Sequence, residues 1–186
     1  TRIELKSRAF SLHSMLKEAV SVAKLLCAIR GLDFEFQVRG KVPGQAIGDE
    51  MRILQAVLCM VGEVSGFGEC GTVVLCVSVE NGSLGSSESS DPNYLAWKRN
   101  VYEGSVLLKF DVSRVKSGED CSSFIQRNCT LARPGIDFSL CEKLAKLMHG
   151  SASTGHDSGD LDRTMNFTIR LPIQDSRGGL IQTRCM

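Results

Sequence analysis

The chain has 186 residues, of which 42% are hydrophobic and 23% charged, and its formal net charge is +1. These values are typical of one soluble globular domain with a core of ordinary size. The near-zero net charge provides no field that would attract nucleic acid or an anionic membrane, and no apolar run reaches the roughly 20 residues of a membrane span. We therefore expect neither nucleic acid nor a membrane as a partner of this domain.

The first part of the chain predicts two amphipathic helices and short strands. The expected elements are a strand at 9–12, a helix at 14–29, a strand at 33–38 and a helix at 50–64 that follows "AIGD". Ser14 is the expected N-cap of the first helix, and Gly31 is expected to stop it. Apolar residues recur at helical spacing in both helices, so each should bury one face.

The second part predicts three strands and one more helix. The expected elements are strands at 71–82, 105–115 and 164–173, a short helix within 118–128, and a helix at 138–148. Residues 81–100 and 151–162 are rich in Ser and Gly and are predicted to be loops. The order of elements predicts an α+β fold, a two-layer sandwich in which three helices cover one face of a mixed β-sheet. We expect one domain over residues 1–173 and a linker or tail at 174–186.

The eight cysteines include no CxxC pair, and several occupy apolar helix or strand patterns. We expect reduced thiols rather than a disulfide framework. The three histidines are far apart, so the sequence predicts no metal site and no catalytic nucleophile. Because the chain starts without Met, we expect it to be a segment of a longer protein.

Three blocks occur in an informative order: "GDEMRILQAVLCMVGEVSGF", "LLKFDVSRVKS" and "RPGIDFSLCEKLAKLMHG". Together they resemble the ATP-binding catalytic domain of sensor histidine kinases, the GHKL or Bergerat fold. More narrowly, "MLKEAVSVAKLL", "GDEMR" and "LCEKLAKLMHG" resemble plant ethylene receptors, in particular subfamily II. The resemblance covers residues 9–172.

The helix over 50–64 corresponds to the family's N box, which carries two Asn that coordinate Mg²⁺. Cys59 and Glu63 occupy these positions. A thiol is a poor ligand for Mg²⁺, which prefers oxygen. Glu63 supplies oxygen but also a charge that repels phosphate, unless a bridging Mg²⁺ reverses that sign. The alternative is that Glu63 is a solvated residue on the outer helix face.

The family's first glycine box is Asp-x-Gly-x-Gly, whose Asp binds the adenine amino group. We match it to "DVSRV", in which Asp111 keeps the carboxylate and Ser113 and Val115 replace the glycines. A β-branched Val115 would obstruct the close backbone approach that glycine allows. The alternative is that Asp111 is an exposed strand residue.

The second glycine box cradles phosphate at a helix start, and here it reads "RPGID". Gly135 keeps the middle glycine, whereas Arg133 and Asp137 replace the other two. Asp137 is the expected N-cap of the helix at 138–148, where its carboxylate would compete with phosphate. Arg133 either pairs with a phosphate or is a surface cation.

The resemblance implies a cytosolic signalling domain of a receptor in the endoplasmic-reticulum membrane. It implies a homodimer formed through upstream segments, a downstream Raf-like protein kinase as partner, and copper only in a transmembrane region outside this chain. With these boxes eroded, we expect ATP and Mg²⁺ binding to be weak or absent and little or no histidine kinase activity. The alternatives are an active Mg·ATP-binding domain with serine/threonine specificity, or an unrelated α+β binding module.

Overall fold

The computed structural model describes residues 4–66, 71–81, 105–115, 138–156 and 163–173. The first elements in chain order are β1 Arg8–Ser11, α1 Leu12–Ile29, β2 Asp33–Arg39, β3 Gln45–Gly48 and α2 Glu50–Val64. They are followed by β4 Thr72–Asn81, β5 Ser105–Val115, α4 Ser139–Leu147, β6 Ser151–His156 and β7 Arg163–Pro172.

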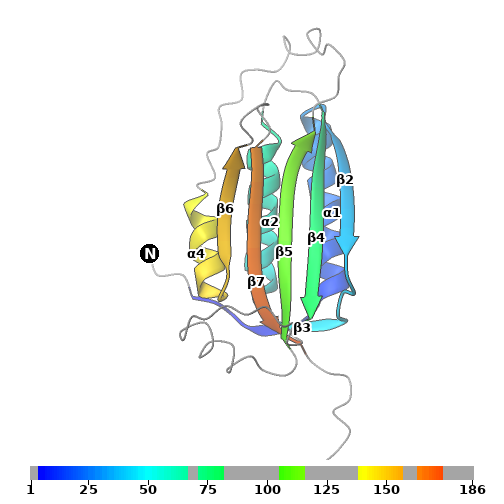
Figure 1. Cartoon of the computed structure of the whole chain (residues 1–186). Helices are drawn as coiled ribbons and strands as arrows, with labels where there is room; N and C mark the ends of the chain where they lie inside the picture. Colours follow the sequence, from blue (N-terminus) through cyan, green and yellow to red (C-terminus); the bar gives the residue numbers. More distant parts are fainter. Residues whose placement is uncertain (1–3, 67–70, 82–104, 116–137, 157–162, 174–186) are drawn as a thin grey trace, which may run out of the picture.

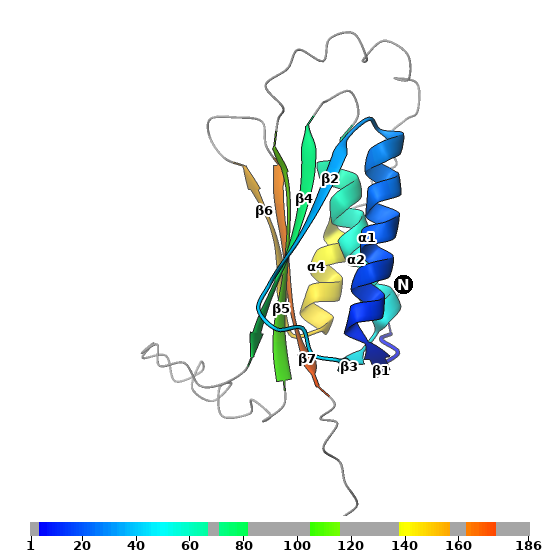
Figure 2. The same ribbon diagram turned by 90° about the vertical axis from the view of Figure 1, so that its right-hand side faces the viewer.

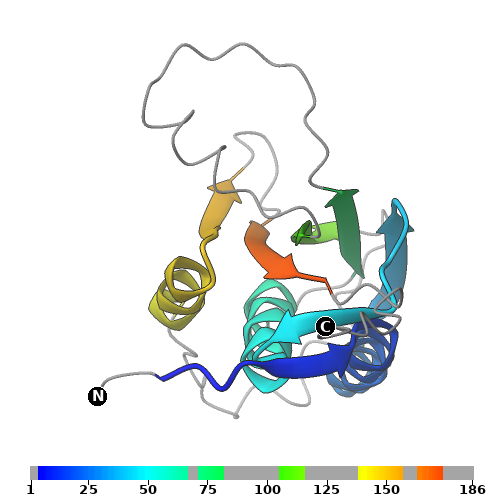
Figure 3. The same cartoon turned by 90° about the horizontal axis from the view of Figure 1, so that it is seen from below.

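The main sheet has five strands in the order β2-β4-β5-β7-β6, and only β2 and β4 run parallel within it. Helices α1, α2 and α4 lie side by side on one face of this sheet (Figures 1 and 2). Strands β1 and β3 form a separate antiparallel pair at one end of the helices (Figure 3). The predicted two-layer α+β architecture is therefore confirmed.

The core lies between the helices and the near face of the sheet. Strand β5 contributes alternate residues to it, including Phe110 and Val112, which are fully buried. Phe110 is in register with Phe167 of β7, and their ring centroids are 6.0 Å apart. Burial of these apolar side chains is what holds the helices on the sheet.

Two sequence expectations are wrong. Helix α1 begins at Leu12 and not after Ser14, because the Ser11 hydroxyl caps it by accepting a hydrogen bond from the Ser14 amide at 3.3 Å. Residues 151–156, expected in a loop, form strand β6, which pairs along β7 from Ser151↔Thr168 to His156↔Arg163. A short polar edge strand of this kind is held by main-chain hydrogen bonds, which leave little hydrophobic pattern in the sequence.

Several expectations fall outside the described residues: the short helix within 118–128, most of the loop at 81–100, and the tail. None of the helices in the described part of the chain has the length and apolar character that crossing a bilayer requires.

Candidate functional site

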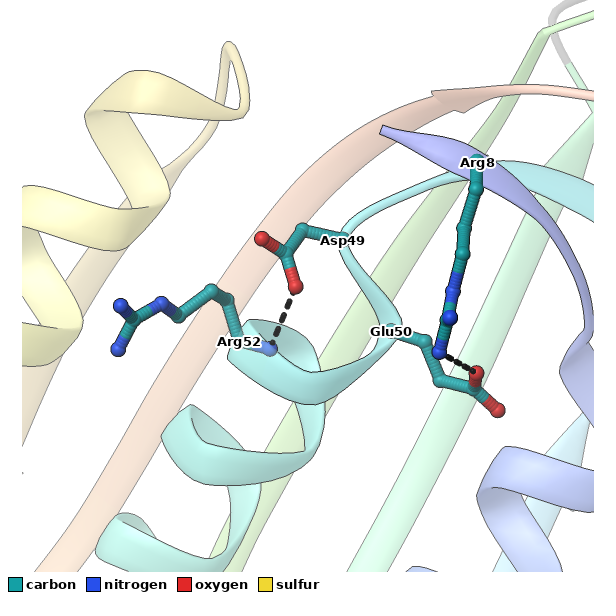
Figure 4. Close-up of polar contacts among 4 residues, drawn as sticks. All are labelled: Arg8, Asp49, Glu50 and Arg52. Atoms are coloured by element: carbon teal, nitrogen blue, oxygen red, sulfur yellow. Dashed lines mark hydrogen bonds and ion pairs between the residues drawn. The ribbon is translucent and has the colours of Figure 1, made fainter. Parts of the chain in front are cut away.

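Helix α2 is anchored at its first turn by a single buried carboxylate. The Asp49 Oδ1 atom accepts a hydrogen bond from the Arg52 amide at 3.1 Å, which caps the helix (Figure 4). The other oxygen, Oδ2, accepts one from the Lys6 amide at 2.8 Å. Beside it, Arg8 of β1 pairs with Glu50 at 3.4 Å (Figure 4). Asp49 thus fixes both the start of α2 and the chain segment that leads into β1.

The side of α2 that faces α4 is closed by two thiols. Cys59 is 2% exposed, and Cys141 of α4 is fully buried. The Cys141 thiol donates to the Ala56 carbonyl oxygen at 3.6 Å, and the Cys59 thiol lies beside it within interaction distance. The first N-box position is therefore part of the contact between two helices.

The interaction with the Cys59 thiol raises the pKa of Cys141 far above the ordinary thiol range, and burial and the nearby Glu63 carboxylate add to this effect. Cys141 therefore stays protonated at physiological pH. A protonated, buried thiol cannot act as a nucleophile or as a metal ligand.

The donor set around Cys59 does not fit Mg²⁺. The ion requires oxygen ligands in octahedral geometry, and Cys59 offers a sulfur that is engaged with another thiol. Glu63, one turn further along, is half-buried and supplies the remaining carboxylate. Among the residues whose positions are described, no group of three or more His, Cys, Asp or Glu could hold a metal ion.

Asp111 lies on the opposite face of the sheet from Cys59 and Glu63. Its neighbours Phe110 and Val112 point to the helices, so Asp111 points away from them, next to Asn166 of β7 in the register. Its Oδ1 atom is 3.1 Å from Lys109 Nζ, within ion-pair distance but without hydrogen-bond geometry. Ser113 and Val115 share this far face, and Val115 is 56% exposed. The structure does not bring these three residues together with α2.

Arg114 is the charged residue that β5 does direct toward the helices, and the sequence analysis missed it. It is 4% exposed, and its Nη1 atom donates to the Val64 carbonyl at 3.4 Å. The apolar alternation that ends at Val112 is the signal that could have identified it, because the next inward position is 114.

A second arginine reaches the same end of α2. Arg30 Nη1 donates to the Gly62 carbonyl at 2.6 Å and to the hydroxyl of the buried Ser65. Cations are favourable at a helix C-terminus because the helix dipole is negative there. Arg30 from the end of α1 and Arg114 from β5 therefore both bind carbonyl groups in the last turn of α2.

The three residues of the second glycine box, Arg133, Gly135 and Asp137, lie outside the described residues, so their predicted roles stay predictions. The helix that follows them begins at Ser139, and no side chain caps it at Phe138.

No protein-family model matches the chain. Ethylene receptor 2 of Oryza sativa subsp. japonica is 32% identical over 178 residues, which cover 92% of this chain and 23% of the receptor. Ethylene response sensor 2 of Arabidopsis thaliana is 28% identical over 174 residues, covering 91% of this chain and 27% of that protein. The chain thus spans about a quarter of the length of these relatives.

Several solved histidine kinases share the fold of this chain. Full-length ShkA in complex with AMPPNP has a TM-score of 0.59 at 19% identity, covering 94% of this chain and 33% of ShkA. The catalytic domain of histidine kinase ThkA, in a nucleotide-free form, has a TM-score of 0.55 at 14% identity, covering 92% of this chain and all of that domain. At these identities the likeness shows a shared fold.

Proposed function

Because the homologues of this chain are plant ethylene receptors and its fold is that of histidine kinase catalytic domains, we propose that it is the signalling domain of an ethylene receptor whose nucleotide cleft no longer supports histidine kinase chemistry. In this proposal the domain keeps the shape of a kinase catalytic module. Its output is a protein contact rather than a transferred phosphoryl group.

The observation that carries the proposal is the contact between Cys59 and Cys141. At the first N-box position, where the family's Asn coordinates a metal ion, this chain has Cys59, and its thiol contacts Cys141 of the neighbouring helix α4. Opening that position to a ligand would separate two buried thiols and expose packed surface of α2 and α4, which costs free energy before any ligand binds.

The Glu63 carboxylate supports the same conclusion. Half-buried beside the thiols, it places negative charge where triphosphate would have to approach. At about 5 Å and an effective dielectric constant of about 20, one such charge repels a phosphate charge by roughly 3 kcal/mol. Without a bound cation to reverse that sign, Glu63 opposes nucleotide binding.

The partners follow from the receptor homology. We propose that the full-length protein lies in the endoplasmic-reticulum membrane, dimerises through segments outside this chain, and binds a Raf-like protein kinase. Copper would belong to an ethylene-binding region that is also outside this chain. The support for these points is the kinship with proteins named ethylene receptors, of which this chain matches about a quarter.

Isothermal calorimetry with ATP, with and without Mg²⁺, tests the proposal. We expect no binding heat, or a Kd weaker than about 0.1 mM, which corresponds to roughly 5–6 kcal/mol. ShkA, which binds AMPPNP in its own structure, is the positive control with that ligand. Micromolar affinity that requires Mg²⁺, together with phosphorylation of Ser or Thr in a protein substrate, would instead establish the alternative of an active serine/threonine kinase.

Replacing Glu63 by Gln separates charge repulsion from steric closure. If repulsion is the main obstacle, Glu63→Gln should strengthen ATP binding tenfold or more. If the thiol contact closes the site, ATP binding should stay undetectable, which is the result we expect. Glu142→Gln on the exposed side of α4 is the matched control.

A further inference from the structure

A groove runs along the outer face of α2, away from the sheet. Its volume is about 1090 Å³, and it also borders α1 and residues 4–8. Its apolar lining includes Leu26 of α1 together with Leu54 and Leu58 of α2. Gly62 continues this surface at the far end of α2, where a side chain would meet no atom within 4 Å.

Apolar surface continues from the groove onto its borders. Met51, which lines the groove at the first turn of α2, is 59% exposed. Leu25 and Ile29, one residue before and three residues after Leu26 on α1, are 61% and 71% exposed. An apolar stripe of this size beside a concavity is a feature of protein-binding surfaces.

The charged residues of the groove are Lys6, Arg8, Arg30 and Arg52 on the positive side and Glu4 and Asp49 on the negative side, so positive charges outnumber negative ones. The Arg52 guanidinium donates to the neutral amide of Gln55 at 2.8 Å, and in Figure 4 it points away from Asp49. Lys6 is exposed at the same end. The nearby carboxylate of Asp49 already accepts two backbone hydrogen bonds, and the charge of Arg8 is balanced by Glu50. The groove therefore favours an occupant with acidic groups beside apolar ones.

The length of the groove suits a helix. From Met51 to Gly62 its floor follows twelve residues of α2, a rise of roughly 16 Å at 1.5 Å per residue. A guest helix of about three turns covers that length and can place apolar residues at i, i+4 and i+7 along it.

We propose that this groove binds an amphipathic helix of a partner protein, one whose apolar stripe is flanked by Asp or Glu. The leucines of the groove accept the apolar stripe, and Lys6 and Arg52 face the acidic flank. Cys59 also borders the groove, but its contact with Cys141 is directed toward α4, whereas the groove opens on the outer side of α2, so the inference does not require that nucleotide binds.

A designed peptide tests this directly. The probe is a fluorescein-labelled 15-residue Ala-based helix with Leu at positions 4, 8 and 11 and Glu beside the Leu stripe. The matched peptide has Lys in place of every Glu. Fluorescence anisotropy with the 186-residue chain at low salt should show saturable binding of the Glu peptide and at least tenfold weaker binding of the Lys peptide. Equal affinities, or no binding of either, would refute the proposal.

Variants locate the binding. Gly62→Trp should fill the groove and weaken peptide binding at least tenfold, whereas the control Leu147→Trp on α4 should bind as the parent chain does. Lys6→Glu with Arg52→Glu should remove the preference for Glu over Lys, and Lys24→Glu with Arg39→Glu should not. Circular dichroism confirms that each variant is folded.

Peptide binding that survives Gly62→Trp in a folded protein would place the site elsewhere. Sedimentation with vesicles of anionic phospholipid, reduced by Lys6→Glu, would show that the basic edge serves a lipid surface, and the proposal would then be wrong.

Discussion

The two long sides of α2 differ in nearly every physical respect. Toward α4 the helix is sealed by Ala56, Cys59 and Cys141, which are fully or almost fully buried. Toward solvent it presents Met51, Leu58 and Gly62 to an open groove. The α4 side of α2 is therefore part of the core, while the side toward solvent is open and partly apolar. Measurements of stability on each side test this contrast.

The largest effect is expected from a cavity on the sealed side. Leu144 of α4 is fully buried, so Leu144→Ala should lower the free energy of unfolding by about 2–5 kcal/mol. Leu147 on the same helix is 43% exposed, and Leu147→Ala should cost less than about 0.5 kcal/mol. Urea denaturation measures both, and similar losses would mean that α4 is not packed as described.

The buried thiols predict sensitivity to alkali. Burial raises the pKa of Cys27 from 9.0 to about 11, although Arg30 acts in the opposite direction. Between these values the unfolded chain loses the proton and the folded chain keeps it, so stability is complete below pH 9 and falls as the pH rises to 11. The loss should reach about 2 kcal/mol relative to Cys27→Ala. If the free energies of unfolding of the parent chain and of Cys27→Ala changed in parallel with pH, this account would be wrong.

The open side predicts a gain in stability. Gly62 lies inside α2, and an added Cβ would meet no atom within 4 Å, so Gly62→Ala should raise the free energy of unfolding by about 0.5–1 kcal/mol. Gly150 is the contrasting case, since a Cβ there would come within 1.7 Å of the Thr168 carbonyl oxygen and must destabilise. Thermal unfolding of both variants should give shifts of opposite sign.

The smallest effect concerns the thiol pair itself. A double-mutant cycle on Cys59→Ala and Cys141→Ala should give a coupling energy of about 0.5 kcal/mol, because each substitution removes the same contact. The control cycle pairs Cys59→Ala with Cys76→Ala, which lies on the far face of the sheet beside Asp111 and should be additive. Additivity in both cycles would show that the two thiols do not interact.

Local patterns were sufficient to predict most of the fold. The apolar spacing of α1 and α2 and the β-branched run of β4 predicted these elements to within a few residues. Strand β6 was missed because its six residues, SASTGH, carry almost no hydrophobic signal and are ordered by pairing with β7. The pairing of two strands depends on both segments, so the pattern of one strand alone does not predict it.

The candidate site was less predictable because it depends on which face each side chain occupies. Asp111 was matched by residue type, with an exposed strand position as the alternative, and the strand period of two places it with Lys109 on the far face. Arg114 does point toward the helices, but it carries a guanidinium where the first glycine box would supply a carboxylate. The contact between the Cys59 and Cys141 thiols joins residues from two helices, and no spacing in the sequence predicts it.

The carboxylate of Asp49 has a mechanical consequence. One oxygen accepts a hydrogen bond from the Lys6 amide and the other from the Arg52 amide in the first turn of α2, so this carboxylate links residues 4–6 to the helix. We expect a force applied at residues 4–6 to reach α2 directly through this carboxylate. Such a mechanical link between residues 4–6 and α2 would require neither a bound nucleotide nor a change of charge.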